Sequence, residues 1–243
     1  MNFYALIIGT EILNARREDK HFKFVRDELQ KYGYSLFATF IVKDDEELMK
    51  NCFELIKNDK NSILFSFGGI GSTPDDLTRD ISAEVFTQKP VVQHPVFGQN
   101  IINRFGEKAY PHRIKMAEIP EGSQLLFNPV NNMSGFSLEN RFFFVPGFPE
   151  MAHPMISDVI SKLCSKKLET YRYTLLAHTS EETLINQMKL LPKHIELSCL
   201  PLFKDAKPMV ELSLSGYNKE DVRKYFDKFI VELKIFDIKY NIK

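Results

Sequence analysis

Residues 62–78, SILFSFGGIGSTPDDLT, are the segment most informative about the fold class. The run 62–67 is short and apolar, which is typical of a strand buried on both faces of a parallel sheet. Three glycines follow it, and Asp75 and Asp76 open a predicted helix over 75–87. A strand, a glycine-rich turn and a helix in this order indicate an α/β fold. Ligands of such folds bind at the carboxyl ends of the strands.

Strands and helices alternate on both sides of this segment. Continuous apolar runs predict strands, and apolar residues at helical spacing predict helices. The alternation favours a mostly parallel sheet covered by helices. We expect strands over 3–8, 35–42, 62–67, 124–127 and 141–145, helices over 20–32, 45–58, 75–87 and 149–165, and a further helical stretch over 94–117.

The pattern changes after Lys166, and ten of the 11 glycines precede that point. Strands are predicted over 170–178, 195–200 and 208–215, and the acidic residues after Thr179 predict a helix start. A last amphipathic helix is predicted over 219–234. We therefore expect two domains, an α/β domain over 1–166 and a small α+β domain over 167–243.

Composition excludes several classes of protein. The 243 residues hold 32 Lys+Arg and 32 Asp+Glu, so a polybasic nucleic-acid binder is not expected. No apolar run approaches the 18 residues or so that predict a membrane span, and the N-terminus has no basic region typical of a signal peptide. The three cysteines are far apart, which predicts buried thiols in a reducing cytoplasm. We expect a cytoplasmic protein without nucleic-acid or membrane partners.

The glycine-rich turn is the strongest candidate site. Gly68, Gly69 and Gly71 allow main-chain amides to approach an anion closely, and a helix N-terminus beside them favours negative charge. The adjacent carboxylates Asp75 and Asp76 are suited to a divalent cation held between protein and phosphate oxygens. The alternative is a capped helix after a tight turn, with both carboxylates only favouring the helix dipole.

Other strand ends carry further candidates. Glu11 follows the first strand and has no obvious capping role, whereas Asp44 is as well explained by capping of the next helix. Gly147 and Glu150 belong to a rigid proline-containing turn, and the polar loop 128–136 is explained as well by plain connection. The six histidines show no metal-ligand spacing and are predicted to be surface or core residues.

These segments together resemble the molybdopterin-binding-domain superfamily, in particular the N-terminal domain of the CinA branch. The resemblance covers about residues 4–155, and a similarity to a small KH-like module follows it. The motifs that carry it are IIGTEIL (7–13), VKDD (42–45), GGIGSTPDDLTRD (68–80), AEIPEGSQLLFNPVNNMSGF (117–136) and FFVPGFPEM (143–151).

The resemblance implies a three-layer α/β/α domain and a metal-dependent pyrophosphatase that hydrolyses ADP-ribose or a related nucleotide to AMP and a sugar phosphate. A metal-activated water would attack one phosphorus, and Mg²⁺, Mn²⁺ or Co²⁺ would serve as cofactor. It implies catalytic roles for Asp75, Asp76 and Glu11, with Asp76 and Glu11 as metal ligands. The implied substrate-binding residues are Gly68, Gly69, Gly71, Ser72, Thr73, Thr78, Asp44, Asn128, Gly135, Gly147 and Glu150.

Two alternatives use the same loop. One is molybdopterin binding or adenylyl transfer, and the other is non-catalytic nucleotide binding. Departures from the family pattern motivate the second, since Ser72 replaces a usual Pro and His21 replaces a frequent Asn. The KH-like part lacks the GxxG loop that holds RNA, so RNA binding is not expected. We also expect no amidase domain of the family's kind, and a homo-oligomer, most simply a dimer.

Overall fold

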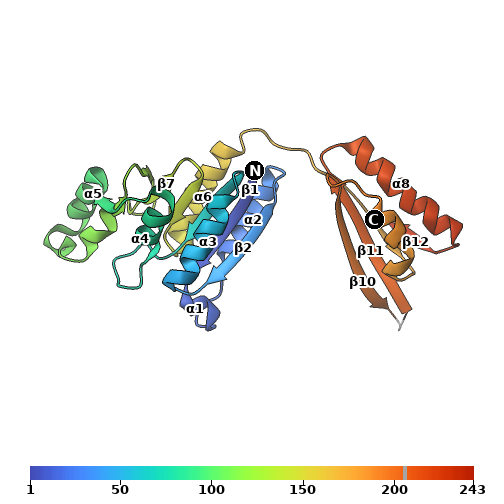
Figure 1. The fold of residues 1–243 in the computed structure, drawn as a ribbon, viewed down its shortest axis with the longest axis horizontal. Coiled ribbons are helices and arrows are strands. Elements are labelled where there is room, and N and C mark those ends of the chain that lie inside the picture. Colours follow the sequence, from blue (N-terminus) through green and yellow to red (C-terminus); the bar gives the residue numbers. More distant parts are fainter. Residues whose placement is uncertain (205–206) are drawn as a thin grey trace. The chain divides into compact units, whose positions relative to one another are not determined.

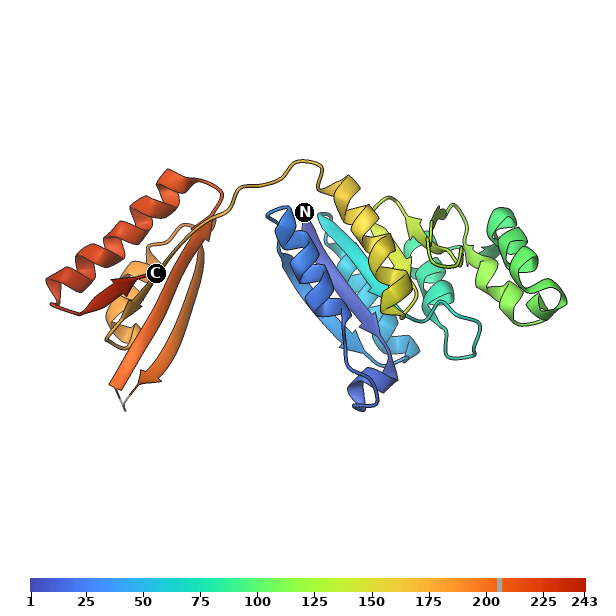
Figure 2. The same ribbon diagram turned by 180° about the vertical axis from the view of Figure 1, so that it is seen from behind.

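The computed structural model describes residues 1–204 and 207–243 (Figures 1 and 2). The chain divides into two compact units, Met1–Lys167 and Leu168–Lys243. Each unit has its own buried apolar cluster, so each is described by itself.

A six-stranded sheet forms the centre of the first unit, and its four strands β2, β1, β3 and β8 run parallel. This mostly parallel α/β architecture is the predicted one. The strand order is β2-β1-β3-β8-β7-β6, and only β7 runs against its neighbours. The strands are β1 (Asn2–Ile8), β2 (Leu36–Val42), β3 (Ser62–Phe67), β6 (Gln124–Leu126), β7 (Gly135–Leu138) and β8 (Phe142–Val145).

Helices cover both faces of this sheet and give the three layers (Figure 1). Alternate residues of β1 divide between the two faces, as the two-residue period of a strand requires. On one face Phe3 packs with apolar residues of α2 (His21–Lys31) and α6 (Pro149–Leu163). On the other face Leu6 packs with α3 (Glu46–Asn58), α4 (Thr78–Ser82) and the π-helical turn η1 (Ala83–Thr87).

A small lobe follows α4 and η1. Strands β4 (Val91–Gln93) and β5 (Glu118–Pro120) pair with each other, and α5 (Pro95–Phe105) lies between them in sequence. Short 3-10 turns, η2 (Gly106–Ala109) and η3 (Arg113–Ala117), complete the lobe around a core that includes Phe97 and Ile101.

Three expectations for the first unit are corrected by the structure. The helix predicted over 75–87 begins at Thr78, because Asp76 turns back to the preceding loop. The helical stretch 94–117 is interrupted at Gly106, which has a φ of +57°. The polar loop 128–136 ends earlier, because Gly135 and Phe136 already belong to β7. The short helix α1 (Thr10–Leu13) and strands β4 and β5 were not predicted.

The second unit is an antiparallel sheet with helices packed on it (Figure 1). The strand order is β10-β11-β9-β12. Apolar residues of α8 such as Phe226 pack against Leu175 and Leu212 of the sheet. The final strand was not predicted. The elements are β9 (Tyr171–Ala177), η4 (Glu181–Leu184), α7 (Ile185–Lys189), β10 (Glu196–Lys204), β11 (Lys207–Gly216), α8 (Lys219–Ile235) and β12 (Tyr240–Ile242).

The cysteines differ in burial. Cys164 is buried as predicted, but Cys52 and Cys199 are only partly covered, because they lie at the margins of their clusters. Burial raises the pKa of all three thiols. Among the helices of the described ranges, none combines the length and apolar character that crossing a membrane requires.

Candidate functional site

The carboxyl ends of β1, β2, β3 and β8 meet at one edge of the first unit's sheet. The strand register aligns Ile7 with Phe67 and Phe67 with Val145. The Gly68 amide donates to the Val145 carbonyl at 3.0 Å, and the Gly9 amide donates to the Val42 carbonyl at 3.0 Å. The loops that follow these strands carry most of the predicted site residues, so the structure brings them to a common edge.

Glycine is required at the first two positions of the β3–α4 loop. Gly68 and Gly69 have φ values of +100° and +67°. A Cβ on Gly68 would lie 2.4 Å from the Ile8 carbonyl oxygen, and a Cβ on Gly69 would lie 2.3 Å from Thr78 Oγ1. The main chain of the loop therefore lies closer to its neighbours than any side chain permits.

Asp76 holds the loop in shape. Its carboxylate accepts hydrogen bonds from the Gly71 amide at 2.7 Å, the Thr73 amide at 2.8 Å and the Thr73 hydroxyl at 2.6 Å. A Cβ on Gly71 would lie 2.5 Å from Asp76 Oδ2. Asp76, which was predicted to be catalytic and metal-binding, therefore stabilises the loop. Its carboxylate keeps one lone pair that a metal ion could bind.

Three amides of the same loop have no such partner. Within the described ranges, the amides of Gly69, Ile70 and Ser72 donate to no protein acceptor. The Ile70 side chain is buried in the core cluster and anchors the loop, whereas Thr73 and Asp75 are exposed. Unpaired amides on a fixed loop are the donors that bind phosphate groups in proteins.

Arg79 is a site residue that sequence reasoning missed. Only 7% of its surface is exposed, and it donates to the Gly71 carbonyl. Burial lowers its pKa, and the nearby carboxylates of Asp76, Asp80 and Glu118 oppose that shift. Among the described residues none forms an ion pair with it. A buried cation without a paired carboxylate costs several kcal/mol, and here it lies directly behind the loop.

Several carboxylates follow other strands at the same edge of the sheet. Glu11, in the first turn of α1, keeps 42% of its side chain exposed and lies 3.6 Å from Arg17. Glu150, in the first turn of α6, is exposed. Asp44 accepts from the Thr10 amide at 2.8 Å and from its hydroxyl at 2.9 Å, so it joins the ends of β1 and β2.

Three of the predicted substrate-binding residues are internal. Thr78 is fully buried and donates to the Gly68 carbonyl at 2.9 Å. Asn128 is fully buried, and its amide group bonds to Asn131 and to the Met133 carbonyl inside its own loop. A Cβ on Gly135 would lie 2.4 Å from the Phe144 carbonyl oxygen. Their positions are explained by loop shape and strand packing rather than by direct contact with a ligand.

Two histidines meet beneath the β8–α6 turn. His21 Nδ1 lies 3.2 Å from His153 Nε2, and His21 Nε2 lies 3.3 Å from the Gly147 carbonyl oxygen. The His21 ring stacks on Phe67, with centroids 4.3 Å apart. Burial lowers the pKa of His21 and lowers that of His153 to about 4. Both rings are therefore neutral at pH 7, and a proton on His21 Nε2 can bond the Gly147 carbonyl. The predicted core role is consistent with this placement.

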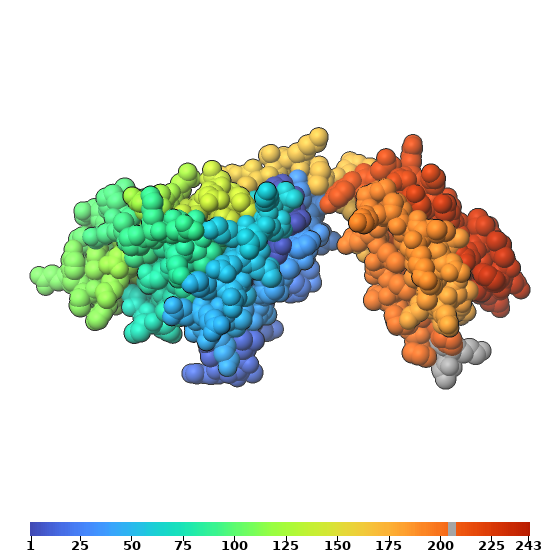
Figure 3. All heavy atoms as spheres, in the orientation of Figure 1, coloured from blue at the N-terminus to red at the C-terminus, as the bar shows by residue number. Residues whose placement is uncertain are grey.

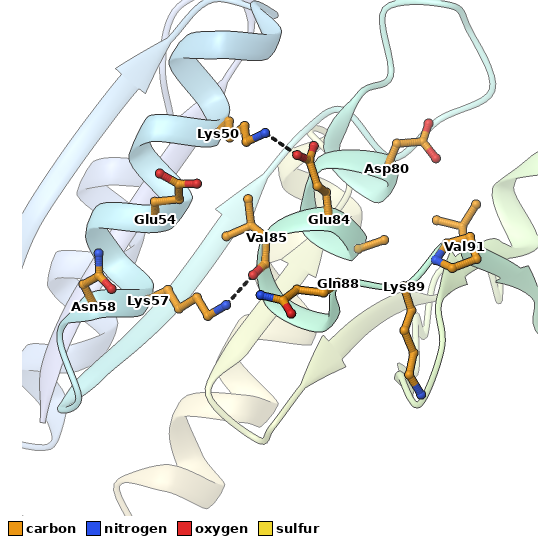
Figure 4. Close-up of a pocket in the computed structure, with 12 residues that line it drawn as sticks. Lys50, Glu54, Lys57, Asn58, Asp80, Glu84, Val85, Gln88, Lys89 and Val91 are labelled. Atoms are coloured by element: carbon orange, nitrogen blue, oxygen red, sulfur yellow. Dashed lines mark hydrogen bonds and ion pairs between the residues drawn. The ribbon is translucent and has the colours of Figure 1, made fainter.

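A small hollow lies at this edge of the sheet. A hollow of about 20 Å³, lined by residues that include Glu11, His21 and Gly147, lies between β1 and the β8–α6 turn. A larger groove of about 800 Å³ lies elsewhere, between α3 and η1, and contains no predicted site residue (Figure 4). Its three lysines and three carboxylates cancel in charge. The parts of the chain around residues 50 and 80, which line this groove, lie on the face shown in Figure 3.

A divalent cation would need ligands from outside the protein. In the described part of the chain, no group of three or more His, Cys, Asp and Glu side chains is arranged to hold a metal ion. Mg²⁺ commonly takes one or two carboxylates and completes its shell with phosphate oxygens and water. Of the carboxylates at this edge, Glu11 pairs with Arg17, Asp75 and Glu150 are exposed, and Asp76 already accepts three hydrogen bonds.

A match to a family model assigns the chain to a protein family. A family model described as "Probable molybdopterin binding domain" matches residues 4–166. The chain belongs to this family. The matched residues include β1, the β3–α4 loop and the β8–α6 turn, so the edge described above lies wholly within the family's domain.

Relatives of this family extend the comparison. A CinA-like protein of Acaryochloris marina is 31% identical over 157 residues, which are 62% of this chain and 37% of that protein. A "Putative competence-damage inducible protein" of Oceanobacillus iheyensis is 26% identical over 236 residues, 90% of this chain and 56% of that protein. The chain thus spans only about half or less of these relatives' length.

A solved structure supports the fold. The crystal structure of CinA from Thermoplasma acidophilum, a protein described as having unknown function, has a TM-score of 0.60 and 24% sequence identity. The similarity covers 68% of this chain and 99% of that one.

The two adjacent aspartates should differ in their effect on stability. Asp76→Ala leaves the Gly71 and Thr73 amides without their acceptor and should cost about 1–3 kcal/mol. Asp75→Ala, which removes an exposed side chain, should cost about 0.5 kcal/mol or less. Denaturant unfolding of both variants measures the difference, and equal losses would contradict the role given to Asp76.

The histidine pair should make stability depend on pH. The folded pKa of His153, about 4, lies below its ordinary value of 6.5, so the unfolded chain binds more protons between these values. Stability should therefore fall as the pH drops from 6.5 towards 4. Thermal unfolding across this range should show a shallower fall for His153→Gln than for the unmodified protein. His112→Gln, at an exposed site, is the matched control, and an unchanged slope in His153→Gln would refute the pair's contribution.

Proposed function

We propose that the first unit binds a phosphorylated pterin of the molybdopterin class through the β3–α4 loop. The observation that carries this proposal is the set of unpaired amides at Gly69, Ile70 and Ser72, on a loop fixed by Asp76 and Arg79. The family model supports the pterin as the ligand class.

The phosphate is expected to accept hydrogen bonds from the loop amides. A backbone donor needs no reorientation when its loop is already fixed, so little entropy is lost on binding. The positive charge of Arg79 lies behind Gly71, and a bound anion would offset its unpaired burial. The pterin ring presents adjacent N–H donors that match a carboxylate, and Asp75, Glu11 and Glu150 offer exposed carboxylates at this edge.

The proposal can be tested by binding in a matched ligand pair. Pterin-6-ylmethyl phosphate should bind, and 6-hydroxymethylpterin, which lacks the phosphate, should bind at least tenfold more weakly in calorimetry. Gly71→Ala should also weaken binding of the phosphate ester by tenfold or more, because its Cβ would displace the Asp76 carboxylate. Gly98→Ala, a helical glycine in α5, is the control variant.

Equal affinity for the two pterins would overturn the role of the loop. Addition of ATP and Mg²⁺ to the same mixture tests adenylyl transfer to the phosphate, which would release pyrophosphate.

A second candidate function is metal-dependent hydrolysis of ADP-ribose or a related nucleotide. The observation that favours it is the presence of exposed carboxylates at the same sheet edge as the β3–α4 loop. Glu11, Asp75 and Glu150 would repel a pyrophosphate unless a divalent cation lay between them and its oxygens. Such a cation would supply Lewis-acid charge and an activated water, while the loop amides would hold the phosphate oxygens.

Turnover distinguishes this candidate from binding alone. With Mg²⁺, Mn²⁺ or Co²⁺, ADP-ribose should yield AMP, and Asp75→Asn and Glu11→Gln should each lower the rate by tenfold or more. Asp158→Asn on the outer side of α6 should leave it unchanged. Binding of ADP-ribose without AMP under all three metals would reject hydrolysis and support a non-catalytic nucleotide-binding protein.

A further inference from the structure

An exposed aromatic ring lies just after β8, where the chain turns into α6. Phe148 occupies the N-cap position of α6, and 51% of its surface is exposed. Serine, threonine, aspartate and asparagine are usual at an N-cap, because their side chains accept hydrogen bonds from the first helix amides. Phe148 makes no such bond, and it belongs to none of the buried clusters of the first unit. Neither capping nor core packing therefore explains this ring.

The main chain that presents the ring is fixed. Pro146 and Pro149 flank the position, and each proline restricts its own φ. The Phe148 carbonyl accepts from the Met151 amide at 3.0 Å and from the Ala152 amide at 2.9 Å. Little main-chain freedom is therefore lost when a ligand contacts the ring.

Arg17, from the segment between α1 and α2, lies over the Phe148 ring. Its guanidinium carbon is 5.3 Å from the ring centroid, and its Nη1 is 3.6 Å from a Glu11 carboxylate oxygen. A guanidinium over an aromatic face is attracted by the ring quadrupole. Among the described residues no second aromatic ring pairs with Phe148. Arg17 thus orients the ring, and the exposed part of the ring is available for stacking.

This ring lies at the same sheet edge as the β3–α4 loop. Gly147 precedes Phe148, and a Cβ on Gly147 would lie 3.4 Å from the Gly68 Cα. Phe148 and the unpaired amide of Gly69 are each one residue away from this contact, and consecutive Cα atoms are about 3.8 Å apart. A ligand with its phosphate on the loop and a flat ring against Phe148 therefore needs only a short link between the two groups.

We infer that Phe148, oriented by Arg17, is the subsite for the flat nitrogen heterocycle of a phosphorylated ligand. The inference rests on the proposed function, since the β3–α4 loop would hold the phosphate of the same ligand. Every such heterocycle has a π-face, so it stacks on an aromatic side chain whatever hydrogen-bonding groups it carries. The pterin of the first candidate function and the adenine of the second share this chemistry.

Calorimetry on the full chain separates the contribution of the ring from that of the phosphate. Phe148→Leu should bind pterin-6-ylmethyl phosphate about tenfold more weakly than the unmodified protein. Its affinity for methyl phosphate, which has no ring, should not change. Phe148→Tyr retains an aromatic ring and should retain the affinity. Phe37→Leu is the matched control, because it removes a ring that is 63% exposed at the start of β2, away from the carboxyl ends of the strands.

Proton NMR of the bound ligand tests the contact itself. Protons held over the face of an aromatic ring move upfield. The C7 proton of pterin-6-ylmethyl phosphate should therefore move upfield on the unmodified protein and on Phe148→Tyr, but not on Phe148→Leu. With AMP in place of the pterin ester, the same shift of the C2 and C8 protons shows whether adenine occupies the subsite.

The outcomes separate this inference from the proposed function. Unchanged affinity of Phe148→Leu for both ligands, without an upfield shift, would overturn the subsite even if the loop amides bind phosphate. If 6-hydroxymethylpterin binds as tightly as its phosphate ester and still shows the shift, the loop is rejected and the subsite stands. If neither the pterin ester nor AMP binds the unmodified protein, both are overturned.

Discussion

The β3–α4 loop depends on one peptide unit being held from two sides. The Asp76 carboxylate accepts from the Gly71 amide, and the buried guanidinium of Arg79 donates to the Gly71 carbonyl. Opposite charges on the two sides of Gly71 fix the direction of the loop. The Asp76 carboxylate also accepts a hydrogen bond from the Thr73 amide. The loop can then leave neighbouring amides unpaired and still keep one conformation. That combination of fixed shape and free donors makes the edge suited to an anion.

The parallel sheet supplies the rest of the edge. Because β1, β2, β3 and β8 run in the same direction, their following loops meet, although they are separated by more than a hundred residues in sequence. Gly68 and Gly147 lie against each other, with a Gly68 Cα 3.4 Å from where a Gly147 Cβ would be. The core beneath is rich in phenylalanine, and Phe144 packs against the rings of Phe53 and Phe136. Rigid packing below the loops keeps their main-chain geometry constant.

Much of this arrangement could be predicted from the sequence, because it depends on local patterns. Apolar runs such as 3–8 and 62–67 mark buried strands, and the three glycines with two aspartates mark the loop between β3 and α4. The strand over 135–138 escaped prediction because it is short and follows a polar loop. The helix start was placed three residues early, since acidic residues after a turn normally belong to the first helical turn.

The remaining features depend on contacts between distant residues. Asn128 and Thr78 have the polar character of ligand contacts. Only the structure shows that the Asn128 amide group bonds to Asn131 and that the Thr78 hydroxyl bonds to the Gly68 carbonyl. The bond between His21 and His153 joins residues 132 positions apart. Arg79 had one sequence signal, a cation among core positions of a helix, but its contact with Gly71 needed the fold.

We propose that the unpaired loop amides bind the phosphate of the ligand. Nitrogen-15 NMR of the full chain, titrated with pterin-6-ylmethyl phosphate, observes those amides directly. The Gly69, Ile70 and Ser72 amide resonances should move together and saturate with the ligand, as amides do when they gain a phosphate acceptor. If these three resonances stay in place while others shift, the ligand binds elsewhere and the loop is not its phosphate site.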